Sequence, residues 1–133
     1  YPKRRGITRV KEFKEYGINV AFAQDSINDP WYPMGNGNMM NVLDNGIHLA
    51  QIMSSEDIKT DLDLITINGA RCLNIQDRYG LDAGKDANFI VLDGDSPYDV
   101  IRNRAGVLAS VRKGEYLFKQ KSVEYDVKLD LGI

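Results

Sequence analysis

Three consecutive polar residues, Gln24, Asp25 and Ser26, follow a short apolar run near the N-terminal end of the chain. A polar cluster at the C-terminal end of a buried strand is where α/β enzymes usually place their catalytic groups. Aspartate is also common at strand ends as a turn former or helix cap, and on spacing alone that is the more frequent role. Asp29 is the better turn former, because Pro30 and two aromatic residues follow it. Asp25 is therefore left without a local role and is the candidate for catalysis.

The elements around this cluster predict an α/β arrangement. Residues 18–23 are too apolar for a surface loop and too few for a typical helix, so we expect a buried strand. A helix is expected over residues 3–16, with Thr8 as a possible cap and Gly17 at its end. A helix that ends at glycine and leads directly into a buried strand is typical of α/β proteins.

Two further helices are expected downstream. Over residues 34–53, apolar positions recur every three or four residues, which predicts one long helix with a core-facing stripe. The lone histidine, His48, lies beside that stripe, and we expect a hydrogen-bonded packing residue rather than a metal ligand, because no second histidine accompanies it. Residues 54–57 have the composition of a helix cap, and residues 61–73 predict another amphipathic helix.

The C-terminal half changes to β-rich runs that glycines separate. Strands are expected at residues 88–92, 107–112 and 116–119, with a hairpin turn over 112–115. Residues 123–131 alternate apolar and charged side chains, as an edge strand does.

The overall composition is that of a globular protein with the length of one ordinary domain. The 133 residues are 43% hydrophobic and 27% charged, with a net charge of -2, so neither nucleic acid nor a membrane is an expected partner. The single cysteine, Cys72, excludes an internal disulfide and agrees with a cytoplasmic location. The chain opens on Tyr1 rather than methionine, from which we expect a fragment of a longer protein.

The sequence resembles the C-terminal part of metal-dependent cytosine deaminases of the amidohydrolase superfamily. The specific blocks are residues 1–12 and the segment Gln24–Ser26 together with Asp29–Pro33. The other blocks that carry the resemblance are residues 17–20, 46–48, 64–66, 70–71 and 84–92, the last of which recurs across the whole superfamily.

The resemblance implies a fold and a domain organisation. The chain would be the C-terminal portion of a distorted (β/α)8 TIM-type barrel plus the C-terminal strands of a β-sandwich subdomain. Residues 1–79 would supply the last barrel elements and closing helices, and residues 80–133 the sandwich strands. Residues 18–24 would be barrel strand eight. That strand should lack neighbours on at least one edge unless another copy or a missing segment supplies them.

The resemblance also implies an activity, the hydrolytic deamination of cytosine or a related aminopyrimidine with release of ammonia. Asp25 would bind one catalytic divalent metal, iron or zinc, and accept a proton from the water on it. Trp31 would form an aromatic wall of the substrate pocket. Ser26 stands where the best-known bacterial enzyme has a second acid, and Gln24 where it has a histidine, so an N-substituted aminotriazine is an alternative substrate.

Several further expectations follow from the resemblance. The other metal ligands and the acid-base glutamate would lie upstream of Tyr1. This chain alone is therefore expected to be inactive, because one aspartate is too few ligands to hold a catalytic metal. The complete enzyme is expected to form a homo-oligomer. An alternative of another class is a non-catalytic partner-binding domain, with helices packed on a small sheet.

Overall fold

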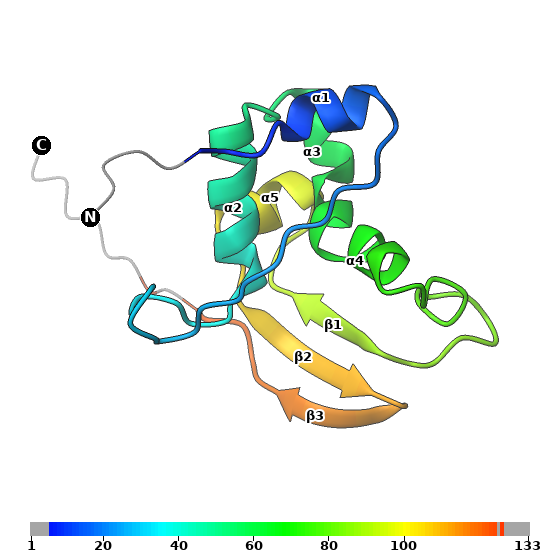
Figure 1. The fold of residues 1–133 in the computed structure, drawn as a ribbon. Helices are drawn as coiled ribbons and strands as arrows, with labels where there is room; N and C mark the ends of the chain where they lie inside the picture. The colour runs from blue at the N-terminus through cyan, green and yellow to red at the C-terminus, as the bar shows by residue number, and fades with distance from the viewer. Residues whose placement is uncertain (1–5, 125, 127–133) are drawn as a thin grey trace, which may run out of the picture.

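The computed structural model describes residues 6–124 and residue 126. Short helices lie on one side of a small antiparallel sheet (Figure 1). The helices are α1 (Val10–Glu15), α2 (Met39–Ala50), α3 (Ser55–Asp61), the 3-10 helix η1 (Leu62–Ile65), α4 (Ile67–Cys72) and α5 (Pro97–Arg102). The strands are β1 (Phe89–Leu92), β2 (Val107–Arg112) and β3 (Glu115–Lys119). No helix in this described part is long and apolar enough to cross a membrane.

The sheet confirms the three strands expected from the sequence. Its order is β1-β2-β3, and both pairs are antiparallel. Lys113 and Gly114 link β2 to β3, and both adopt positive φ values, 51° and 82°. Two such residues suit the right-handed twist of a tight hairpin, as the sequence predicted for this turn. Most of the predicted edge strand over 123–131 lies outside the described residues, and residues 123, 124 and 126 form no strand.

Helix α2 is shorter than the helix predicted over residues 34–53. It starts after Asn38, whose side-chain Oδ1 accepts a hydrogen bond from the Met40 N–H at 2.9 Å. Gly37 adopts a φ of 71° just before that cap, which a helix does not allow. At the other end, the chain leaves the helix through Gln51 in the left-handed conformation. The apolar stripe is confirmed, because Met40, Leu43 and Ile47 are buried.

Three other expectations for the helices were wrong in detail. His48 is exposed on α2 rather than packed, because the helix turns its neighbour Ile47 into the core instead. The helix predicted over 61–73 is divided into η1 and α4, since Thr66 between them is far from helical, with φ -130° and ψ -101°. The helix predicted over 3–16 is confirmed only as α1, and residues 3–5 are not among those described.

The core lies between the helices and extends on both sides of the predicted boundary at residues 79 and 80. Leu43 of α2 and Leu64 of η1 are almost fully buried, and they share one cluster with Val100 and Ile101 of α5. Ile52, Val10, Met40, Ile47 and Ala105 complete this cluster. The division into domains 1–79 and 80–133 stays a prediction.

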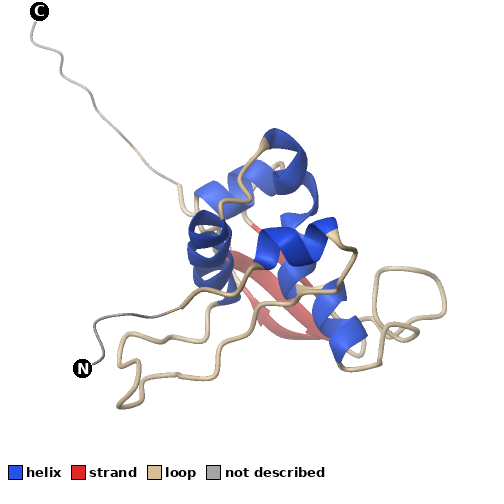
Figure 2. Cartoon of the chain, turned by 45° about the horizontal axis from the view of Figure 1, so that its top comes forward, coloured by secondary structure: helices blue, strands red, loops and turns tan. Residues whose placement is uncertain are grey.

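The buried strand predicted over residues 18–23 is not formed. The chain between α1 and α2 is a continuous loop without helix or strand (Figure 2). Two of its backbone groups form hydrogen bonds with residues of η1 and α4 instead. The Phe22 N–H donates to the Leu64 carbonyl at 2.7 Å, and Asn68 Nδ2 donates to the Val20 carbonyl at 2.9 Å. The segment is at most half-buried, and it has no strand neighbour within the described residues.

Candidate active site

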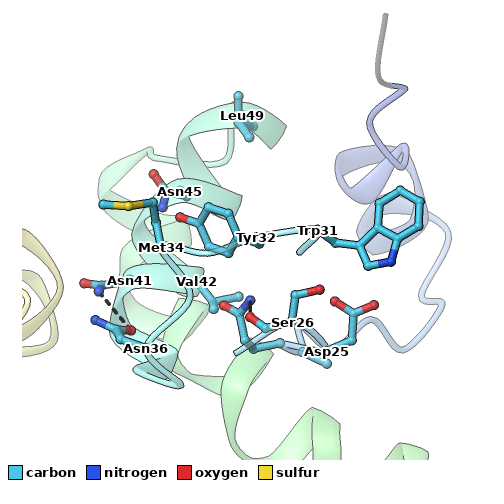
Figure 3. A pocket seen from close by; sticks show the side chains of 12 residues that line it. Asp25, Ser26, Trp31, Tyr32, Met34, Asn36, Asn41, Val42, Asn45 and Leu49 are labelled. Atoms are coloured by element: carbon cyan, nitrogen blue, oxygen red, sulfur yellow. Dashed lines mark hydrogen bonds between the residues drawn. The ribbon is translucent and has the colours of Figure 1, made fainter. Parts of the chain in front are cut away.

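An open cavity of about 900 Å³ lies between the loop after residue 22 and helix α2. The three residues that the sequence analysis selected, Asp25, Ser26 and Trp31, all line it. In Figure 3 the side chains of Asp25 and Ser26 lie next to each other, with the Trp31 indole on the same side of the cavity as Asp25. Tyr32 points the other way, towards Asn45 of α2. Folding thus brings the candidate residues together at one end of the cavity.

The segment that carries Asp25 is held against α2 through Phe22 and Gly46. A Cβ atom at Gly46 would clash with the Phe22 ring, whose Cδ2 would be only 2.8 Å away. Glycine at this position of the helix therefore lets the ring approach the α2 backbone. The residues on either side of Asp25 are linked, because Gln24 Nε2 donates to the Ser26 carbonyl at 2.8 Å. Asp25 itself is exposed, so its carboxylate faces the open cavity.

The aromatic loop, residues 26–35, is organised by Asp29. Its Oδ1 accepts hydrogen bonds from the N–H groups of Trp31 and Tyr32, both at 2.9 Å, which confirms that Asp29 forms the turn. The Tyr32 N–H is the main cause that lowers the pKa of Asp29, and burial opposes it. The loop ends at Gly35, whose backbone lies against the carbonyl group of Ser26. A Cβ atom at this position would clash with that carbonyl group, so glycine allows the close approach.

The opposite wall of the cavity comes from α2 and the residues before it. Asn41, Asn45 and Leu49 line the cavity from successive turns of the helix, one on each turn. Asn36 also lines it, and its Oδ1 accepts from Asn41 Nδ2 at 3.5 Å (Figure 3). Sequence reasoning missed this amide-rich wall. The signal was the four-residue spacing of asparagines on the face opposite the apolar stripe.

The cavity offers one carboxylate to a metal ion. Among the described residues that line it, Asp25 is the only acid, and none is a histidine or a cysteine. Among residues 6–124 and 126, no three histidine, cysteine or acidic side chains are grouped closely enough to hold a metal. Catalytic zinc sites use about three protein ligands. The described residues therefore do not form a complete metal centre, although Asp25 has the chemistry of a single ligand.

The sequence matches the model of the amidohydrolase family over residues 1–118. A curated relative, N-isopropylammelide isopropyl amidohydrolase from Pseudomonas sp. (strain ADP), is 33% identical over 109 residues, which are 82% of this chain and 27% of that protein. S-triazine hydrolase from Gordonia rubripertincta is 33% identical over 92 residues, or 66% of this chain and 19% of its own.

Among solved structures, 5-methylcytosine deaminase from Klebsiella pneumoniae, liganded with phosphonocytosine, superimposes with a TM-score of 0.86 and 46% sequence identity. The match covers 95% of this chain and 31% of that one. The 133 residues thus span less than a third of the length of each of these three proteins.

Proposed function

The chain belongs to the amidohydrolase family, and from that premise we propose that it carries part of the active site of a hydrolase that deaminates cytosine or a related aminopyrimidine. One observation carries the proposal. Asp25, Ser26 and Trp31 meet at one end of a cavity in a chain that is 46% identical to a 5-methylcytosine deaminase. An acid, a hydroxyl group and a flat aromatic surface suit a small planar base that is to be attacked by water.

Each of the three side chains has a role in this proposal. Asp25 accepts the proton of the attacking water, and its exposed carboxylate can be reached from the cavity. Ser26 offers a hydroxyl group that can donate or accept a hydrogen bond at the edge of the substrate ring. Trp31 provides an aromatic surface for the ring to stack on.

The proposed cofactor is one divalent iron or zinc ion with Asp25 as one ligand. Amidohydrolases generally use such a metal, and both ions accept carboxylate ligands. The remaining ligands would have to come from outside the described residues, since these hold no complete metal cluster. For the same reason we expect the 133 residues by themselves to be inactive.

We propose further that residues 18–24 act as a barrel strand in the complete enzyme, with residues 80–133 contributing to a β-sandwich. Residues 18–24 have no strand neighbour within the described part of the chain, which leaves their backbone open to such pairing except where the helices already bind it. A cytoplasmic location, a small-molecule substrate and a homo-oligomeric assembly belong to the same proposal.

A second candidate substrate is an aminotriazine that carries an N-substituent. Two relatives at 33% identity are named for amidohydrolase and hydrolase activity on ammelide and s-triazine compounds. The family match favours either hydrolase over the alternative of a non-catalytic partner-binding domain.

The first prediction tests Asp25 in the protein expressed from its complete gene. Asp25→Asn should lower metal-dependent ammonia release by about 100-fold to 10,000-fold, the usual contribution of a general base. Ammonia is measured with cytosine and 5-methylcytosine as substrates, and isopropylamine is measured with N-isopropylammelide. Asp77→Asn is the matched control, because Asp77 is exposed and does not line the cavity.

Near-normal turnover by Asp25→Asn would exclude the proposed proton acceptor. A wild-type protein that hydrolyses N-isopropylammelide but releases no ammonia from either cytosine would favour the aminotriazine over the aminopyrimidine.

A further inference from the structure

The aromatic loop presents its side chains to the cavity without much support from packing. Trp31 is 83% exposed and Tyr32 is 45% exposed. An indole with so few neighbours is oriented mainly by the backbone that carries it. The position of the proposed stacking surface therefore depends on what holds the loop backbone.

That backbone is held from within the loop by Asp29. One carboxylate oxygen receives two N–H groups, those of Trp31 and Tyr32, each at 2.9 Å. Hydrogen bonds to an ionised group are stronger than those between neutral groups. The Gly35 N–H then donates to the Tyr32 carbonyl at 3.0 Å, so the chain turns back towards Ser26 directly after the aromatic pair.

The two aromatic side chains leave this anchored backbone in opposite directions. Figure 3 shows the Trp31 indole on the side of Asp25 and the Tyr32 ring directed towards α2. A rotation of the peptide between them would therefore move the indole relative to Asp25 and Ser26. The two hydrogen bonds to Asp29 come from the backbone N–H of Trp31 itself and from that of the next residue, Tyr32, so they fix the backbone on both sides of the Trp31 side chain.

We propose that Asp29 is a positioning residue for substrate binding, which orients the Trp31 ring through the backbone N–H groups of Trp31 and Tyr32 without contacting the substrate. This rests on the proposed function, because it assumes that a planar substrate ring stacks on Trp31. Asp29 is not part of the hydrophobic core. Its substitution should therefore change substrate affinity rather than the stability of the fold.

The experiment compares Asp29→Ala with Asp29→Asn in the full-length metal-loaded enzyme. The alanine variant loses the acceptor, and we expect its KM for cytosine to rise about tenfold, in line with the loss of one or two hydrogen bonds. Its kcat and melting temperature should stay close to those of the wild type. The asparagine variant keeps an acceptor oxygen in the same place and should recover most of the affinity. Asp77→Ala is the control for loss of an exposed carboxylate.

A double-variant test asks whether Asp29 acts through Trp31. In a Trp31→Ala background, Asp29→Ala should raise KM no further, because there is no indole left to orient. Amide hydrogen exchange gives a readout that needs no activity, since the N–H groups of Trp31 and Tyr32 should exchange faster in Asp29→Ala but not in Asp29→Asn.

The possible failures are distinguishable. If the wild type releases ammonia and Asp29→Ala keeps a normal KM, the inference is wrong and the proposed function stands. Additive effects of Asp29→Ala and Trp31→Ala, or an Asp29→Asn variant as impaired as Asp29→Ala, would also overturn it. If the wild type hydrolyses no aminopyrimidine or aminotriazine, the proposed function fails and this inference fails with it.

Discussion

Ser26 lies next to Asp25 at the cavity end where the substrate ring is proposed to bind (Figure 3). It is half-buried, so a change of its side chain alters the lining of the cavity. Because the two residues are consecutive, the choice of serine or an acid after the aspartate changes the polar groups near the ring edge. At the scale of single residues, Ser26 is therefore the position most suited to set substrate preference.

We predict that Ser26→Asp in the full-length enzyme changes preference among aminopyrimidines more than it changes metal content. A carboxylate only accepts hydrogen bonds at neutral pH, whereas the serine hydroxyl group both donates and accepts. The kcat/KM ratio for cytosine against 5-methylcytosine and the metal content per protein measure the two effects. Ser55→Asp is the control, because Ser55 is exposed at the start of α3. Loss of metal from Ser26→Asp would place Ser26 nearer the ligands than proposed.

At the scale of elements, helix α2 connects the cavity to the core. Its buried face carries Leu43 and Ile47, while Asn41 and Asn45 line the cavity from another face. The same helix receives the Phe22 ring at Gly46, and this contact fixes the chain three residues before Asp25. Arg104 attaches α2 to the end of α5 through Asp44, with Nη2 at 2.6 Å from the carboxylate.

We predict that Gly46→Ala destabilises the protein by about 1–3 kcal/mol, the usual cost of overpacking a filled site. The new methyl group would clash with the Phe22 ring, which must then move together with the segment that carries Asp25. Urea unfolding measures the loss of stability, and ammonia release should fall as well. Gly69→Ala is the matched control. Gly69 is also helical and has open space around a Cβ, so alanine there should be neutral or stabilising by up to about 1 kcal/mol. Equal effects of the two changes would contradict the proposed packing role.

At the scale of the whole molecule, stability depends on two carboxylates that share one lysine. Lys14 of α1 lies 3.2 Å from Asp61 and 3.4 Å from Asp57, both on α3. Burial is the main cause that raises the pKa of Asp61, which is fully buried, and Lys14 opposes it. The Ser54 hydroxyl is the main cause that lowers the pKa of Asp57. The two groups therefore affect the pH dependence of unfolding in opposite directions.

The sign of each contribution follows from linkage between protonation and folding. The pKa of Asp61 is raised in the folded state. Its contribution to the free energy of unfolding is therefore complete below the pKa of the unfolded chain, about 3.8, and is lost as the pH rises through the folded-state pKa. Asp57 has a lowered pKa, so its contribution is present above about 3.8 and is lost as the pH falls through the folded pKa.

We therefore predict opposite pH trends for two variants. The stability of the wild type relative to Asp61→Asn should decrease as the pH rises from about 3 to about 7, whereas its stability relative to Asp57→Asn should increase over the same range. Urea unfolding midpoints at a series of pH values measure both differences, and each variant serves as the control for the other. Parallel trends would show that the burial of Asp61 does not set its protonation.

Local sequence patterns were sufficient for much of the fold. The hairpin at Lys113 and Gly114, the apolar stripe of α2 and the turn at Asp29 were all predicted, because each depends on residues within a few positions of one another. Helix α5 was missed, although Ser96 caps it and Pro97 starts it, which is a recognisable start signal. Its length of 6 residues is too short for apolar periodicity to be visible.

The sequence by itself determined which family this chain resembles and which acid, Asp25, is the candidate for catalysis. Only the tertiary structure decided that residues 18–24 pair with the helices rather than with a strand, and that Gly46 receives the Phe22 ring. It also decided that asparagines of α2 form the wall opposite Asp25. The physical reason is the separation along the sequence between the residues that interact. Turns, caps and helical stripes are set by neighbours along the chain, whereas the partners of an extended segment and the lining of a cavity depend on residues tens of positions away.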